Sequence, residues 1–177
     1  ADSVDDEQLK EFINFYFEGN TQDEFDDFVE AKTEIFLCTP FNFTEKDIAF
    51  LQHFNEINLQ LLEKTSLDFL SQLSHIKALT IQQGKQNVAG VVPISEEFVA
   101  DYSVLNGLKE LEKLTIKSGY TDFDLSHISS LKNLKDLWLS GLTLGIENVF
   151  VNKRVETLNL YECNFDIDQI VNAFPKV

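Results

Sequence analysis

Apolar residues recur along the chain in the order apolar-x-x-apolar-x-x-apolar-x-apolar. The copies are Leu51, Phe54, Ile57, Leu59; Leu73, Ile76, Leu79, Ile81; Leu108, Leu111, Leu114, Ile116; and Leu131, Leu134, Leu137, Leu139. Degenerate copies contain Ile35 with Leu37 and, near the C-terminus, Val155, Leu158 and Leu160. Two apolar residues separated by one point to the same side of a strand. Each copy therefore predicts a short strand with one core-facing side.

The period of the pattern indicates how these strands are connected. The first core residues of successive strands are 22, 22, 35, 23 and 21 residues apart, starting from Ile35. Four of these intervals fall within the roughly 20–29 residues of a leucine-rich repeat. The long interval contains Gly84, Gly90 and Pro93, which are typical of a loop. We therefore expect an insertion at residues 84–98.

Segments such as LKNLKDLWLSGL and VETLNLYECNF make residues 33–170 resemble the leucine-rich-repeat family. The Asn that the family places after a strand is clear at Asn164, whereas Gly84 and Gly119 stand in that region elsewhere. The resemblance implies an α/β solenoid with a parallel concave sheet of about six strands. Because each coil buries its apolar side only against its neighbours, the coils have to stack.

Helical segments are expected on the convex side and at both ends. Thr44, Ser66 and Ser95 each precede an apolar run and fit helix starts. Residues 1–32 lack the repeat, and their apolar spacing predicts a helical N-terminal cap. Residues 33–177 form the predicted solenoid, which a helix over 166–174 closes at its other end.

The charge of the chain is strongly negative and unevenly distributed. The formal net charge is −16, and residues 1–50 contain 14 acidic residues against 3 lysines. Such a surface disfavours nucleic acid and anionic membranes, and it favours a basic protein partner through long-range attraction. The densest acidic run consists of Asp23, Glu24, Asp26, Asp27 and Glu30. It fits either a solvated helix face or a patch that steers a basic partner.

No arrangement of residues predicts catalysis, a metal or a cofactor. His53 and His75 lie one repeat apart, but the spacing fixes no third ligand. Asp124, Ser126 and His127 are close only in sequence, and proximity in sequence does not define a triad. Phosphate-binding glycine motifs are absent from the sequence. We therefore expect a protein that is not an enzyme.

The sequence alone does not decide the cellular compartment of the protein. The two cysteines, Cys38 and Cys163, are too few and too far apart for a disulfide framework, which favours free thiols and the cytoplasm. No apolar run reaches the roughly 18–20 residues that span a membrane. A secreted or periplasmic location is the alternative, and Asn42 would then be a glycosylation acceptor.

The candidate binding residues are the side chains that alternate with the core positions and so face outward on the concave side. Trp138, the single tryptophan, lies between Leu137 and Leu139, and Tyr161 lies one strand further along. Trp and Tyr are enriched among residues that dominate binding energy. The other candidate contacts are Asn159, Asp136, Lys117, Lys113, Phe36, Glu56, Asn58 and Gln60.

These features predict a protein–protein interaction module that acts as a monomer. The sharpest hypothesis is an acidic inhibitor, of the immunity-protein type, that occludes a basic toxin or enzyme. A regulatory adaptor that holds an enzyme is the first alternative, and a secreted adhesin or receptor fragment is the second. Whether the insertion at 84–98 takes part in binding remains open.

Overall fold

A computed structural model describes residues 34–39, 43–62, 65–87, 90–92, 100–146 and 150–177. The predicted N-terminal helical cap (1–32) and the helix start at Ser95 lie outside these residues. The domain boundary between 32 and 33 therefore stays a prediction.

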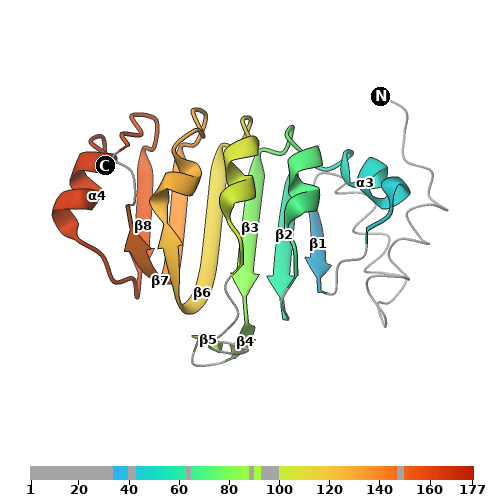
Figure 1. The fold of residues 1–177 in the computed structure, drawn as a ribbon, viewed down its shortest axis with the longest axis horizontal. Coiled ribbons are helices and arrows are strands. Elements are labelled where there is room, and N and C mark those ends of the chain that lie inside the picture. Colours follow the sequence, from blue (N-terminus) through green and yellow to red (C-terminus); the bar gives the residue numbers. More distant parts are fainter. Residues whose placement is uncertain (1–33, 40–42, 63–64, 88–89, 93–99, 147–149) are drawn as a thin grey trace.

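Six parallel strands form the main sheet, in the spatial order in which the chain makes them (Figure 1). The strands are β1 (Glu34–Cys38), β2 (Glu56–Leu61), β3 (Ala78–Gln83), β6 (Lys113–Asp124), β7 (Asp136–Gly145) and β8 (Thr157–Tyr161). Every neighbouring pair is parallel. This confirms the predicted parallel sheet of about six strands and the sequence register on which it was based.

The core lies on one side of this sheet because the two apolar positions of each strand align from strand to strand. One row contains Ile35, Ile57, Leu79, Leu114, Leu137 and Leu158, and the next contains Leu37, Leu59, Ile81, Ile116, Leu139 and Leu160. In the first five strands these side chains are at most 1% exposed. The stacked rows form one continuous hydrophobic core.

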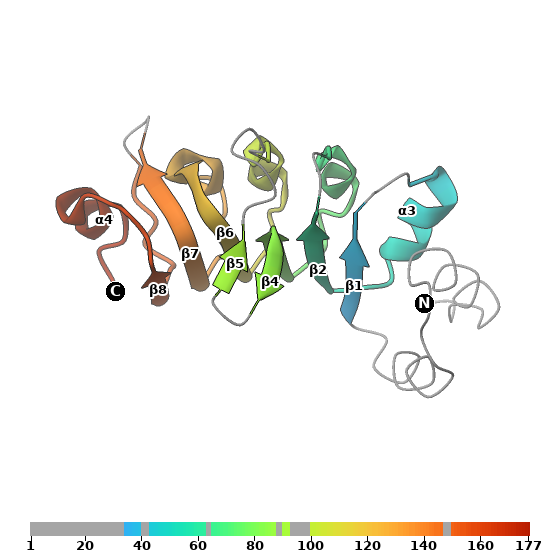
Figure 2. The same ribbon diagram turned by 90° about the horizontal axis from the view of Figure 1, so that it is seen from below.

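The connections return along one side of the sheet, as Figure 2 shows. Helix α3 (Glu45–Leu51) begins as predicted at Thr44, whose side chain and that of Asp47 form a reciprocal capping box. The later connections are shorter 3-10 turns: Asp68–Gln72, Ser103–Gly107 and Leu125–Ile128. The predicted helix start at Ser66 is thus a 3-10 turn, in which Ser66 accepts from the Asp68 N–H at 3.0 Å.

The 3-10 turns repeat the same backbone geometry. Leu73, Leu108 and Leu131 each donate an N–H to the carbonyl three residues earlier, at 2.9, 3.0 and 3.1 Å. A 3-10 turn rises about 2.0 Å per residue against about 1.5 Å in an α-helix, so it spans the return path with fewer residues, which suits coils of 21 to 23 residues. The convex side is therefore built mainly from short turns rather than from full α-helices.

The insertion contains regular structure that the sequence did not predict. β4 (Lys85–Asn87) and β5 (Gly90–Val92) pair antiparallel, at the carboxyl end of β3 (Figure 1). Gly84, just before this hairpin, has a positive φ of 108°, a conformation that glycine adopts without strain. The expected loop is therefore, at least over these residues, a small hairpin.

Strands β6 and β7 are longer than the others because they continue around the corner of the solenoid. Their register shifts between Lys117 and Thr121, and pairing then resumes from Thr121 with Leu142 to Asp124 with Gly145. Phe123 is buried by this second stretch, at 1% exposed. Backbone hydrogen bonds therefore join β6 to β7 on both sides of this corner.

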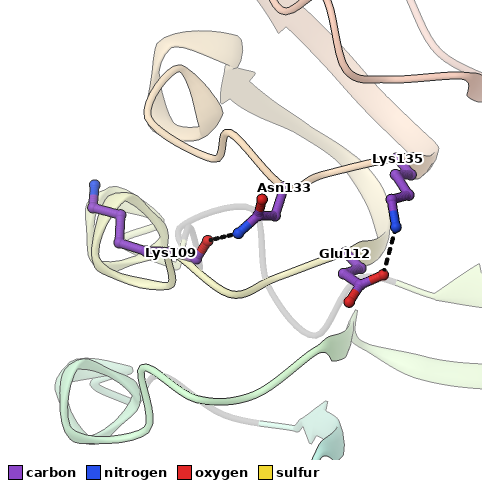
Figure 3. A network of polar contacts seen from close by, with 4 residues as sticks. All are labelled: Lys109, Glu112, Asn133 and Lys135. Carbon is purple, nitrogen blue, oxygen red and sulfur yellow. Dashed lines mark hydrogen bonds and ion pairs between the residues drawn. The ribbon is translucent and has the colours of Figure 1, made fainter.

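Polar contacts also join neighbouring coils at the approach to β6 and β7 (Figure 3). The Lys135 Nζ lies 2.8 Å from the Glu112 Oε2, and the Asn133 side chain donates to the Lys109 carbonyl at 2.9 Å. The hydrogen bond and charge of Lys135 lower the pKa of Glu112, and those of Glu112 raise the pKa of Lys135. Because this pair is exposed to solvent, it contributes little to the stability of the fold.

A buried tyrosine links the insertion side of the core to the next coil. The Tyr102 hydroxyl donates to the Gln83 Oε1 at 3.1 Å, and its ring packs edge-on against Phe123 at 5.2 Å. Tyr102 is 2% exposed, and its burial raises the pKa of the phenol strongly. The folded chain therefore keeps this phenol neutral at a pH at which an unfolded chain ionises it.

This difference predicts a loss of stability in alkali. An unfolded tyrosine titrates near pH 10, so the unfolded state releases a proton that the folded state retains, and stability falls as the pH rises above about 10. Tyr102→Phe removes this part of the alkaline loss, and near neutral pH it costs about 1–2 kcal/mol because a buried hydrogen bond is lost. Urea unfolding at pH 8 and pH 11 measures both effects. If the wild type and the variant differ in free energy of unfolding by the same amount at both pH values, the prediction is wrong.

Candidate protein-binding surface

The side of the main sheet opposite the helices and turns is here called the open face. Its residues form three rows across the six strands. The rows are Glu34, Glu56, Ala78, Lys113, Asp136, Thr157; Phe36, Asn58, Thr80, Thr115, Trp138, Asn159; and Cys38, Gln60, Gln82, Lys117, Ser140, Tyr161. All the predicted contact residues of the sheet lie on this face. Their role in binding remains a prediction.

Trp138 projects outward at the middle of the C-terminal half of the open face. It is 48% exposed, whereas its neighbours Leu137 and Leu139 are 1% and 0% exposed. The Lys117 Nζ lies 5.9 Å from the centroid of its ring, within the range of a cation–π contact. Lys117 thereby partly orients the indole while leaving much of it open to solvent.

Tyr161 lies on the next strand and extends the aromatic surface. It is 60% exposed. Trp138 pairs with Asn159, and Tyr161 lies two residues further along β8, so Tyr161 is the diagonal neighbour of Trp138 on the same face. Diagonal neighbours on adjacent strands are close enough for aromatic side chains to act on one ligand. We call Lys113, Lys117, Asp136, Trp138, Asn159 and Tyr161 the aromatic half of the open face.

The other end of the open face carries the opposite electrostatic character. Glu34 and Glu56 are paired neighbours in one row, and the Asn58 amide donates to the Glu34 carboxylate. Phe36, 49% exposed, lies between them and the Cys38–Gln60 pair, where the Cys38 thiol is 4.0 Å from the Gln60 Oε1. We call Glu34, Phe36, Glu56, Asn58 and Gln60 the acidic half.

The negative net charge of the chain is therefore not spread evenly over the open face. The aromatic half has two lysines and one aspartate, whereas the acidic half has two glutamates and no cation. Glu56 and Lys113 lie in the same row two strands apart, which is about 10 Å. A ligand lying across the strands meets negative charge at one end and cationic and aromatic groups at the other.

Two other predicted features fall partly or wholly outside the described residues. The acidic run Asp23, Glu24, Asp26, Asp27 and Glu30 lies entirely outside them. Of the insertion, the backbone of β4 and β5 is described, and it lies at the carboxyl end of β3 rather than across the open face (Figure 2). A role of either feature in binding remains a prediction.

Some of the residues considered as metal ligands or as a catalytic triad have structural partners. The His75 Nε2 is within 3.0 Å of the Phe54 carbonyl oxygen. Asp124 caps the turn at Leu125–Ile128 by accepting from the Ser126 N–H at 2.9 Å. Over the residues that the structure describes, no three His, Cys, Asp or Glu side chains cluster as metal ligands would.

Both cysteines are free thiols at opposite ends of the sheet. Cys38 ends β1, and Cys163 follows β8 and donates to the Leu139 carbonyl at 3.3 Å. Burial raises the pKa of both thiols, so the reactive thiolate is disfavoured.

The sequence did not identify every unusual surface residue. The C-terminal helix α4 (Ile167–Ala173) forms as expected, with Asp166 as its N-cap, and it buries Ile170 and Phe174. Ile167 and Val171, two apolar residues of this predicted closing helix, are 61% and 58% exposed. Their spacing of four places them on one helix face, and periodicity alone does not show that this face is exposed.

No protein-family model and no curated protein matches the chain. Among solved structures, internalin C2 from Listeria monocytogenes is similar over 95% of this chain and 88% of its own, with 14% sequence identity and a TM-score of 0.34. Among the described helices, none is long and apolar enough to cross a membrane. The assignment of a leucine-rich-repeat-like α/β solenoid accordingly depends on the parallel register of the six strands.

Proposed function

We propose that the chain is a protein-binding module and that its open face is the binding surface. The observation that carries the proposal is Trp138, which is held outward by a fully buried pair of leucines and flanked by Lys117 and Tyr161. A large aromatic side chain on a sheet face that no described helix covers loses its hydration only when a partner packs on it. Six strands also give a sheet about 24 Å wide, which suits an interface of about 800 Å² per partner.

We further propose that the partner is basic and that one protomer holds it by occlusion, as an inhibitor of the immunity-protein type holds a toxin or enzyme. The net charge of −16 would attract a basic protein over long range. Glu34 and Glu56 would receive its cationic groups, while Trp138 and Tyr161 would take an apolar anchor. Attraction would set the rate of encounter and the aromatic half would set the lifetime of the complex.

A regulatory adaptor that binds an enzyme is the second candidate, and the charge of the aromatic half favours it. Lys113 and Lys117 outnumber Asp136 there, so a partner that docks on this half alone need not be basic. The two candidates differ in how salt acts on the complex. Binding driven by opposite charges weakens strongly as salt screens them, whereas aromatic docking changes little.

Capture from the native source tests the proposal. The immobilised chain is expected to retain a stoichiometric partner with a basic isoelectric point, and a rise from 0.05 to 0.5 M salt is expected to release it, since the screening length falls from about 14 to about 4 Å. A Glu34→Lys/Glu56→Lys variant removes the acidic half and should lose the same partner. Val151→Ala, at a side chain 52% exposed and outside the open face, is the control. Retention that neither salt nor the acidic-half variant affects would favour the adaptor, and failure to retain any partner would contradict both candidates.

A further inference from the structure

Four cationic residues gather on the edge of the solenoid at which the strands begin. Lys109, Lys132 and Lys153 each lie five residues before the first core residue of a strand, on β6, β7 and β8 respectively. Because these strands pair in register, the three lysines occupy the same position on three successive coils. Arg154 directly follows the last of them. We call these four residues the basic ridge.

The basic ridge contrasts with the charge of the chain, which is −16. All four of its residues are exposed. Over the described residues none of the four forms an ion pair, and the ion pair found there joins Lys135 to Glu112. Each ridge lysine is followed by one further residue of the edge, and among these Glu110 is the one acidic residue. Like charges on neighbouring coils repel one another, and a bound anion would relieve this repulsion.

Hydrogen bonds between coils hold the backbone beneath the basic ridge. The Asn133 side chain donates to the Lys109 carbonyl at 2.9 Å. The Asn152 side chain donates to the carbonyl of Leu131, one residue before the second ridge lysine, at 3.3 Å. Asn152 also accepts from the Arg154 N–H at 2.8 Å. A backbone that is already fixed reduces the entropy lost when a ligand binds.

Lys109 marks one end of the basic ridge. Its side chain points away from the Glu112–Lys135 ion pair (Figure 3). The ammonium donates to the Asn106 carbonyl, a neutral acceptor that leaves the positive charge uncompensated. The same position on the preceding coil is Ser74, which has no charge. The ridge is therefore limited to the coils of β6, β7 and β8.

We propose that the basic ridge binds a short acidic segment of a protein partner, which lies along the axis of the solenoid. Three coils at a spacing of about 4.8 Å span about 10 Å, the length of about four residues of extended chain. Carboxylates of such a segment would reach one lysine on each coil. The planar guanidinium of Arg154 would hold one carboxylate through two parallel hydrogen bonds.

The limited length of the ridge favours a short acidic segment over a long polyanion. From residue 34 to residue 99, the part of the chain that precedes the ridge contains 8 acidic residues and 4 lysines. A nucleic acid or a sulfated glycan that extends past Ser74 would meet this negative charge and be repelled by it. A segment of about four residues ends before it.

The basic ridge is separate from the open face, so this inference goes beyond the proposed function. The ridge lies on the edge where the strands begin, whereas the open face is formed by the strands themselves. The acidic half of the open face suits cationic groups, and the ridge suits carboxylates. One chain could therefore hold a basic partner on its open face and an acidic segment on this edge at the same time.

Fluorescence anisotropy of a labelled Gly-Glu-Glu-Glu-Glu-Gly peptide tests the proposal on the whole chain. We expect saturable binding of one peptide at 0.05 M salt and its loss at 0.5 M salt, where the screening length is about 4 Å. Lys132→Gln combined with Lys153→Gln is expected to raise the dissociation constant about tenfold, because two of the four cations are lost. Since both lysines are exposed, this variant is expected to fold normally.

Lys46→Glu is the matched control, because it changes the net charge by the same two units. It is exposed on α3, at the opposite end of the solenoid (Figure 1), and should change the dissociation constant less than about twofold. Equal effects of the two variants would overturn the proposal by tracing the binding to net charge. No binding at about 1 mM peptide would also overturn it, as would tighter binding of a four-phosphate oligothymidylate. The test uses no natural partner, so its outcome is separate from that of the proposed function.

Discussion

Replacement of Trp138 with alanine is expected to weaken binding of the protein partner by about 2 kcal/mol or more, roughly 30-fold, with little change in the stability of the fold. The indole is 48% exposed in the free chain, so its removal leaves no cavity in the core. A partner loses the largest apolar contact of the open face and the cation–π group formed with Lys117. Calorimetric titration with the captured partner measures the loss.

Two further variants separate the contribution of the aromatic ring to binding from that of Lys117. Trp138→Phe keeps an aromatic ring and is expected to retain most of the affinity, whereas Lys117→Ala should cost less than Trp138→Ala because a partly exposed cation–π contact contributes only about 0.5–1 kcal/mol. Val151→Ala again serves as the exposed apolar control. Equal binding by wild type and Trp138→Ala would show that the partner docks elsewhere.

Replacement of Leu137 with alanine is expected to destabilise the fold by about 3 kcal/mol or more. Leu137 is 1% exposed and lies between Leu114 and Leu158 in one core row, so truncation leaves a cavity bounded by coils on both sides. In a solenoid each coil is stabilised by its neighbours, and a defect in the middle therefore weakens two contacts between coils. Equilibrium unfolding in urea measures the change.

Leu158→Ala is the matched comparison, since it removes the same atoms from the same row one strand later. Leu158 is only partly buried, and we expect its loss to cost about 1 kcal/mol. The difference between the two variants thus measures how much less the last coil is covered than the middle. Equal destabilisation by both would mean that the last coil is as well covered as the middle.

The strands and their register could be predicted from the sequence because the pattern is redundant. Each strand has two core residues separated by one outward residue, and a shift by one position would expose both, as in Leu137-Trp138-Leu139. The same alternation placed Trp138 and Tyr161 on the surface. The start of α3 was equally predictable, because Thr44 and Asp47 form a local capping box that depends on no distant residue.

The remaining differences arise where local pattern does not determine the structure. A turn as short as Asp68–Gln72 is too brief for helical periodicity to distinguish a 3-10 turn from an α-helix. Ile167 and Val171 have the spacing of a core face, but which face of α4 is covered depends on what lies next to it. Net charge does not locate charge, and it was the alternation along the strands that placed Lys113 and Lys117 beside Trp138 on the open face.

The single tryptophan offers the most direct test that the open face is the binding surface. A chain labelled with 5-fluorotryptophan gives one fluorine resonance, that of residue 138, whatever tryptophans an unlabelled partner contains. In the free chain this resonance should respond to solvent isotope exchange, as expected for an exposed indole, and on addition of the captured partner it should shift and lose that response. A resonance that keeps its position and its solvent response in the saturated complex would contradict the account.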